Sequence, residues 1–180
     1  MTTTTAAGTD SGLVFTGRAW VLGDNVPTDE IVPTHWVFSP MDEIKKHALE
    51  NLKPEFAPGV QPGDIIVAGH HFGQSSGRAV APKVLQAVGV ACIVADGFAR
   101  TFLRNAFEIG LPILELHGAG TFAADGDQVT ADVVSGQVRN VTQDRTAQGE
   151  PTSDFLLTML RAGGLIPLVR STGSRLGIDG

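Results

Sequence analysis

The segment from His70 to Pro82 carries side chains that could bind an anion and move a proton. It reads His70-His71-Phe72-Gly73-Gln74-Ser75-Ser76-Gly77-Arg78-Ala79-Val80-Ala81-Pro82. Proline suits the first turn of a helix, so the two serines and the arginine are expected in the loop ahead of that helix. The free N–H groups of a helix start stabilise an anion, and arginine can grip a carboxylate or phosphate with two parallel hydrogen bonds. The segment therefore indicates an anion-binding loop; the alternative is an ordinary glycine turn with a solvated arginine.

A second polar segment lies nearer the start of the chain and reads Gly23-Asp24-Asn25-Val26-Pro27-Thr28-Asp29-Glu30-Ile31-Val32-Pro33. Taken alone it is typical of a turn, because aspartate, asparagine and proline are common turn residues. Two adjacent histidines, His70 and His71, cannot lie on one face of a strand, and no carboxylate completes a ligand spacing with them. We therefore expect no metal site in this chain.

Short apolar runs predict the elements that would position these loops. Continuous apolar runs of this length are typical of strands that are covered on both faces. The runs lie at 64–69, 91–95 and 111–116. Helical patterns lie between them at 81–88 and at 98–109, the second with Asp96 as its expected cap. Because ligands bind beyond the carboxyl ends of parallel strands, the serine loop after the first run is well placed for a site.

The rest of the chain predicts one mixed α/β domain over 13–170 with a small antiparallel patch. Ser39 and Pro40 mark the start of a helix that ends before Pro54, and valines between glycines at 126–142 indicate an antiparallel hairpin or meander. A helix is expected at 152–162 and a short strand at 165–169. The ends, 1–12 and 171–180, read as a disordered tail and a polar tail.

Composition excludes several classes of protein. The chain has 180 residues, 42% of them hydrophobic, and a net charge of −6. No cluster of lysine or arginine offers the basic face that nucleic-acid binding needs. The longest run without polar side chains is far shorter than the roughly 20 residues that a membrane helix needs, and the start has no apolar signal region. We expect a cytoplasmic protein.

Four stretches, in this order along the chain, resemble the small subunit of 3-isopropylmalate dehydratase, a separate swivelling domain of the aconitase superfamily. They lie at 23–33, 63–78, 98–112 and 162–167. The resemblance spans roughly 15–169. It implies a single swivelling α/β domain with a mixed, partly parallel and barrel-like sheet, flanking helices and an antiparallel patch.

The resemblance also implies roles for the serine loop. An ungapped alignment places the family's catalytic serine on Ser76 and its arginine, which binds substrate, on Arg78. The family's second serine becomes Gly77, which we also expect near the substrate, and its glutamate becomes Ala79. A shift by one residue would make Ser75 the base instead, so both serines are candidates.

The first polar segment gains roles in the same way. Asp29 matches the aspartate that orients groups near the substrate, and Thr28 precedes it. The segment Thr34-His35-Trp36-Val37-Phe38 matches the family's substrate-recognition loop, so His35 and Trp36 are candidate substrate contacts. The family usually has an arginine where this chain has His35. That departure keeps citramalate, dimethylmalate and homoaconitate open as alternatives to 3-isopropylmalate.

The implied activity is a hydro-lyase acting on a 2- or 3-hydroxy di- or tricarboxylate, in branched-chain amino acid biosynthesis. The implied partner is a large subunit that carries a [4Fe–4S] cluster on three cysteines, in a heterodimer or heterotetramer. This chain has one cysteine, Cys92, so it holds neither that cluster nor an internal disulfide. The alternatives from other classes are a non-catalytic carboxylate- or phosphate-binding module and a small subunit kept for partner binding alone.

Overall fold

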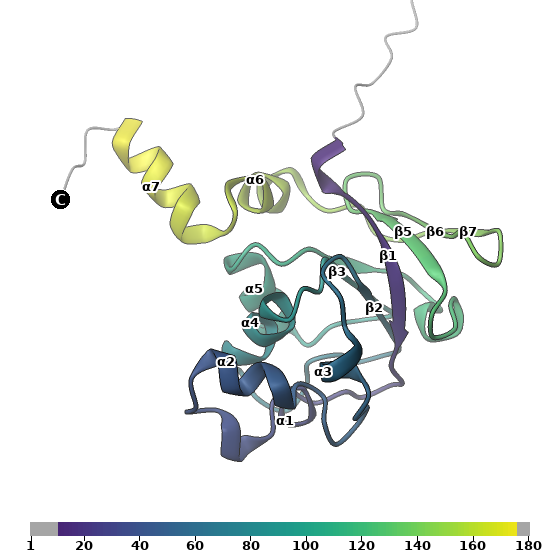
Figure 1. The fold of residues 1–180 in the computed structure, drawn as a ribbon. Helices are drawn as coiled ribbons and strands as arrows, with labels where there is room; N and C mark the ends of the chain where they lie inside the picture. The colour runs from purple at the N-terminus through teal and green to yellow at the C-terminus, as the bar shows by residue number, and fades with distance from the viewer. Residues whose placement is uncertain (1–10, 176–180) are drawn as a thin grey trace, which may run out of the picture.

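The computed structural model describes residues 11–175, in which seven strands form one curled sheet (Figure 1). Their order across the sheet is β4-β3-β2-β1-β5-β6-β7. The strands are β1 (Val14–Val21), β2 (Ile65–Ala68), β3 (Cys92–Ala95), β4 (Ile113–Glu115), β5 (Gln128–Asp132), β6 (Gln137–Asn140) and β7 (Arg145–Gln148). Neighbours from β1 to β4 are parallel, whereas β1–β5, β5–β6 and β6–β7 are antiparallel. The mixed sheet with an antiparallel patch confirms the predicted fold class.

The parallel half holds the centre of the core. Every residue of β2 and β3 is buried, as expected for strands that are covered on both faces. The helices α4 (Val80–Ala87) and α5 (Arg100–Glu108) connect the parallel strands and confirm the two predicted central helices. The predicted cap of α5 is wrong, because the residue before the helix is Ala99. The Asp96 carboxylate instead accepts the Gly118 backbone N–H at 2.9 Å.

The segment between β1 and β2 folds as short helical pieces rather than as one helix. They are α1 (Thr28–Ile31), a 3-10 turn (Thr34–Trp36), α2 (Met41–Ile44), a 3-10 turn (Lys45–His47) and α3 (Phe56–Gly59). The predicted continuous helix breaks after His47, because Leu49 takes a φ of +57° and its N–H donates to the Ile31 carbonyl at 3.1 Å. The predicted apolar stripe is still buried at Ile44, Ala48 and Leu49.

The end of the described chain is helical. α6 (Asp154–Ala162) confirms a predicted helix, and α7 (Leu165–Arg175) extends away from the rest of the domain in Figure 1. The strand predicted at 165–169 is therefore wrong, and the predicted polar tail begins inside α7. Proline is tolerated in the first helical turn, where Pro167 lies. A 3-10 turn (Ser11–Leu13) and a 3-10 turn (Ala119–Thr121) complete the elements. Most of the predicted tails, at 1–10 and 176–180, lies outside the described residues.

Candidate active site

The candidate site forms where β1 and β2 end. The two strands are parallel neighbours, so the chain leaves both of them at the same edge of the sheet. The loops that follow are then joined by backbone hydrogen bonds. The Gly73 N–H donates to the Val26 carbonyl at 2.8 Å, and the Thr28 N–H donates to the Gln74 carbonyl at 2.9 Å. These bonds bring the two polar segments of the sequence together, although they are nearly 50 residues apart.

Three hydroxyl groups meet at this junction. The Oγ1 of Thr28 lies 2.8 Å from the Oγ of Ser76 and 3.5 Å from the Oγ of Ser75. Thr28 is buried, Ser76 is half-buried and Ser75 is exposed. Ser75 has a φ of +78°, a backbone conformation that is uncommon for residues other than glycine and occurs often at functional sites. Ser76 therefore has the closer hydroxyl partner of the two candidate bases.

An ion pair lies beside the hydroxyls. The Nη1 of Arg78 is 2.9 Å from the Oδ1 of Asp29, and it also donates to the Oγ1 of Thr34 at 3.3 Å. The contact with Asp29 lacks hydrogen-bond geometry, so this buried oxygen has no hydrogen-bond donor among the described residues. Within the same residues the Nη2 of Arg78 donates no hydrogen bond. One edge of the guanidinium thus remains available for a second carboxylate.

Helix α5 packs against the serine loop at 72–78 and holds it in place. The Phe72 ring is fully buried and makes an edge-to-face contact with Phe102, with centroids 5.2 Å apart. Gly73 has a φ of +79°, and a Cβ there would collide with the Phe102 ring, so the chain passes close to the helix only with glycine. The buried Asn105 donates from Nδ2 to the Gly77 carbonyl at 3.2 Å. Sequence reasoning missed Asn105, although it lies three residues after Phe102 and so on the same face of the helix.

The predicted recognition loop lies next to Arg78 through Thr34. His35 is exposed, and its Nε2 is 3.8 Å from the Oε1 of Glu50. Trp36 is half-buried against the core, and its Nε1 donates to the same Glu50 oxygen at 3.1 Å. The structure thus gathers five of the predicted residues at one place, namely Thr28, Asp29, Ser75, Ser76 and Arg78. Gly77 lies in the same loop, and the substrate contacts of Gly77, His35 and Trp36 stay predictions.

The residues of this chain do not fit a metal cluster. Among residues 11–175 no group of three or more histidine, cysteine, aspartate or glutamate side chains could hold a metal ion. Cys92 lies in β3 with no exposed surface, and burial raises the pKa of its thiol to about 12. A buried thiol of that kind is a poor ligand, because a metal binds the thiolate. No helix in the described part of the chain is long and apolar enough to cross a membrane.

Known proteins are similar to this chain in sequence and in fold. A family model described as the aconitase C-terminal domain matches residues 40–118. The 3-isopropylmalate dehydratase small subunit 1 of Methanopyrus kandleri is 40% identical over 163 residues, which cover 90% of this chain and 96% of the relative. The chain belongs to the family of the 3-isopropylmalate dehydratase small subunits. The family also includes relatives named for another substrate: the homoaconitase small subunit of Methanothermobacter thermautotrophicus is 46% identical over 155 residues, 85% of this chain and 89% of the relative.

The same family is represented among solved structures. A crystal structure of 3-isopropylmalate dehydratase from Methanocaldococcus jannaschii matches with a TM-score of 0.85 and 29% identity. The match covers 93% of this chain and 99% of that chain. The agreement extends over nearly the whole chain, so the two proteins share the fold.

Proposed function

We propose that this chain is the small subunit of a hydro-lyase that removes water from a 2- or 3-hydroxy di- or tricarboxylate and adds it back. The observation that carries the proposal is the meeting of a hydroxyl pair, Thr28 and Ser76, with an ion pair, Asp29 and Arg78. These four side chains supply a group that can take a proton and a group that can hold a carboxylate, at one edge of the sheet. Family membership supports the reaction class.

Ser76 is the proposed base. It takes the proton from the substrate carbon next to a carboxylate, onto its Oγ. A serine hydroxyl is a poor base in water, so its negative form needs hydrogen-bond donors and positive charge nearby. The Thr28 hydroxyl is close enough to donate to Ser76 Oγ, at 2.8 Å. The Thr28 backbone is fixed by its bond to Gln74, which keeps that hydroxyl in place.

Arg78 is the proposed carboxylate ligand. Its contact with Asp29 holds one side of the guanidinium, while Nη2 donates no hydrogen bond among the described residues. A guanidinium binds a carboxylate best with two parallel N–H groups, which lysine cannot reproduce. Asp29 therefore orients Arg78 rather than consuming all of its hydrogen-bonding capacity.

The proposed enzyme needs a second chain. The names of the relatives as small subunits support a large-subunit partner. The family resemblance implies a [4Fe–4S] cluster on that partner, and the single buried cysteine of this chain cannot supply three ligands for one. The first substrate to test is 3-isopropylmalate. Citramalate, dimethylmalate and homoaconitate are the other members of the substrate class to test.

Co-expression with the large subunit under anaerobic conditions tests the function. The rise in ultraviolet absorbance of the unsaturated acid is followed for each hydroxy acid of this panel. We expect turnover of at least one substrate, loss of detectable turnover in Ser76→Ala, and retained turnover in the matched variant Ser75→Ala. Arg78→Lys is expected to raise KM by about tenfold or more, since a charge-assisted hydrogen bond contributes about 1.5–3 kcal/mol.

Each outcome has a defined meaning. Full activity of Ser76→Ala together with an inactive Ser75→Ala would move the base to Ser75. Binding of the hydroxy acids without turnover, in a complex whose cluster is intact, would favour a non-catalytic carboxylate-binding module. An unchanged KM in Arg78→Lys would refute a carboxylate contact at that residue.

A further inference from the structure

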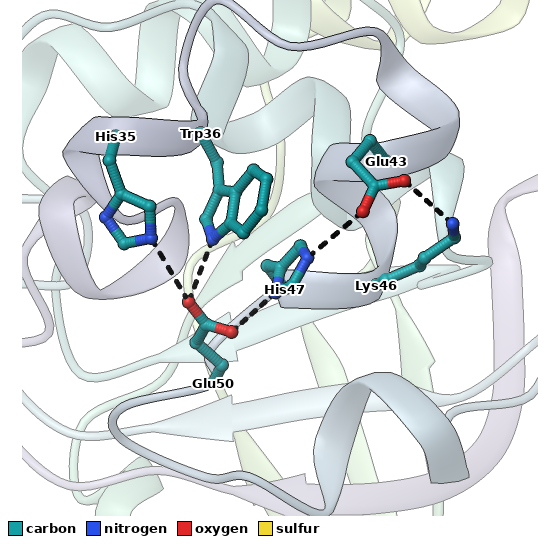
Figure 2. Close-up of polar contacts among 6 residues, drawn as sticks. All are labelled: His35, Trp36, Glu43, Lys46, His47 and Glu50. Carbon is teal, nitrogen blue, oxygen red and sulfur yellow. Dashed lines mark hydrogen bonds and ion pairs between the residues drawn. The ribbon is translucent and has the colours of Figure 1, made fainter.

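A cluster of aromatic and charged side chains connects the loop 34–38 to α2 and to the turns after it. Figure 2 shows its members, which come from the loop, from α2 and from the turns after α2: His35, Trp36, Glu43, Lys46, His47 and Glu50. Glu50 lies at its centre. Among the described residues none of these side chains makes a hydrogen bond or ion pair with Ser76 or Asp29, so the roles proposed for those two residues do not explain Glu50.

Glu50 fixes Trp36 through both of its carboxylate oxygens. Oε1 accepts the indole N–H of Trp36 at 3.1 Å, and Oε2 lies 2.6 Å from the Nδ1 of His47 (Figure 2). The His47 ring stacks on the Trp36 ring, with centroids 3.8 Å apart and planes within 11° of each other. The tryptophan is therefore held at its edge by Glu50 and on its face by a ring that Glu50 also holds.

The backbone at Leu49 places Glu50 in this position. Leu49 is fully buried at a φ of +57°, which is strained for a leucine, and its N–H donates to the Ile31 carbonyl at 3.1 Å. Strain of this kind persists only where the surroundings determine the conformation. It breaks the helix that the sequence predicts here and directs the next side chain, Glu50, toward Trp36.

The cluster reaches the proposed site through one turn of chain. Trp36 ends the 3-10 turn that begins at Thr34, and the backbone N–H of Trp36 donates to the Pro33 carbonyl at 2.9 Å. At the start of the same turn, the Oγ1 of Thr34 accepts from the Nη1 of Arg78. A displacement of Trp36 would therefore move the hydroxyl that helps to orient the arginine.

We propose that Glu50 is a positioning residue, which fixes Trp36 and thereby orients Arg78 for the substrate carboxylate. The role of Arg78 rests on the function proposed above. Both partners of Glu50 also favour its charged form: the hydrogen bond with His47, ahead of the one from Trp36, holds the pKa of the Glu50 carboxyl below its usual range despite partial burial. Glutamine can still accept from the indole and approach His47, whereas alanine can do neither.

The first arm of the test uses the isolated, ¹⁵N-labelled chain. Its two tryptophans give two indole N–H signals, and the Nε–H signal of Arg78 is identified by its loss in Arg78→Lys. In Glu50→Ala we expect the Trp36 indole and Arg78 signals to shift and the Trp20 indole signal to stay. Glu50→Gln should leave all three near their original positions. Glu55→Ala is the matched control, because Glu55 is exposed and its one ion pair within the described residues is with Lys53, at 3.8 Å. An Arg78 signal that does not move in Glu50→Ala overturns the proposal.

The second arm uses the complex with the large subunit. Glu50→Ala should raise KM by about tenfold with kcat within about twofold, and Glu50→Gln should restore KM. A merely structural role would lower the active fraction, and so kcat, while leaving KM unchanged; that result overturns the proposal. If Glu50→Ala does not fold, Trp36→Phe keeps an aromatic ring beside His47 and removes the indole N–H that Glu50 accepts, and the same shift of the Arg78 signal is expected in the isolated chain. A wild-type complex without turnover defeats the proposed function, whereas the first arm still decides whether Glu50 orients Arg78.

Discussion

Asp64 gives the sharpest test of what holds the sheet to its covering loops. It lies at the start of β2 with a residue exposure of 5%. Its Oδ2 accepts three hydrogen bonds, from Arg18 at 2.8 Å, from the Trp20 indole at 2.8 Å and from the Gln61 backbone at 2.9 Å. Replacement by alanine removes the acceptor that joins β1 to the loop before β2.

The cost of Asp64→Ala follows from what is left unpaired. The Trp20 N–H is buried and loses its acceptor, which costs about 1–3 kcal/mol, and the half-buried Gln61 N–H adds about 1 kcal/mol. The Arg18 side chain is 41% exposed and keeps the Gly59 carbonyl, so the lost ion pair adds little, about 0–1 kcal/mol. We expect a loss of about 3 kcal/mol, or about 6–12 °C in Tm for a chain of this length.

Urea unfolding and calorimetry of the isolated chain measure this loss. Asp42→Ala is the control, since Asp42 is exposed and pairs only with Lys45, and its Tm should not change measurably. Equal Tm values for Asp64→Ala and the control would refute the reasoning.

The pH dependence gives a second check. Burial opposes ionisation of Asp64, yet the hydrogen bonds from Arg18, Gln61 and Trp20 hold its pKa below its usual range. The stabilisation of the folded state by the Asp64 carboxylate is therefore fully present above the unfolded-state pKa of about 3.9. It is lost as pH falls through the lower native pKa. The difference in the free energy of unfolding between wild type and Asp64→Ala should be constant near neutral pH and should shrink below about pH 4. A difference that stays constant down to pH 2 would contradict the assignment.

Three further outcomes are expected. Gly17→Ala should lower the free energy of unfolding by about 1–3 kcal/mol in urea titrations, because a Cβ there would collide with the Gly63 carbonyl oxygen. Cys92 should resist maleimide in the native chain at pH 8 and react fully in urea, since a pKa of about 12 leaves about one thiolate in ten thousand; rapid native labelling would show that the strand opens. Asn140→Ala should cost about 1–3 kcal/mol by calorimetry, because its fully buried amide donates to one carbonyl and one carboxylate; a change within error would mean that water replaces the amide.

The parallel half of the fold could be predicted because its buried strands are continuous apolar runs in the sequence. The runs at 65–68, 92–95 and 113–115 are apolar at nearly every position, and a glycine or proline lies within two residues of at least one end of each. β1 escaped prediction because its buried side chains, Ala19 and Trp20, are adjacent rather than alternating, and Gly17 and Arg18 interrupt the pattern. β7 is an almost wholly exposed edge strand, and its one apolar residue, Ala147, gives no alternating pattern.

The errors at 39–52 and 165–169 have different causes. The first segment has a helical stripe, but a long-range bond from Leu49 to Ile31 outweighs the local preference of the chain for helix. The second is a short apolar run around Pro167, and such runs fit a strand or a helix equally well. It lies beyond the sheet without a strand to pair with, so it forms its hydrogen bonds within a helix.

The site was predictable in composition and only partly in geometry. The serine loop and the threonine–aspartate pair were recognisable by residue type and by the family resemblance. Their closeness depends on the bonds from Gly73 to Val26 and from Thr28 to Gln74, which a single sequence does not reveal. Glu50 was missed because neither its type nor its spacing distinguishes it from other surface acids.

The position of β1 constrains the order in which the nascent chain can fold. Its parallel neighbour, β2, begins 44 residues after the end of β1, and its antiparallel neighbour, β5, begins still later, at Gln128. On the ribosome β1 therefore has no neighbouring strand to pair with until the chain up to β2 has also emerged. Contacts of such high sequence separation slow folding, so the rate of collapse should depend on how long the stretch between these strands remains unstructured.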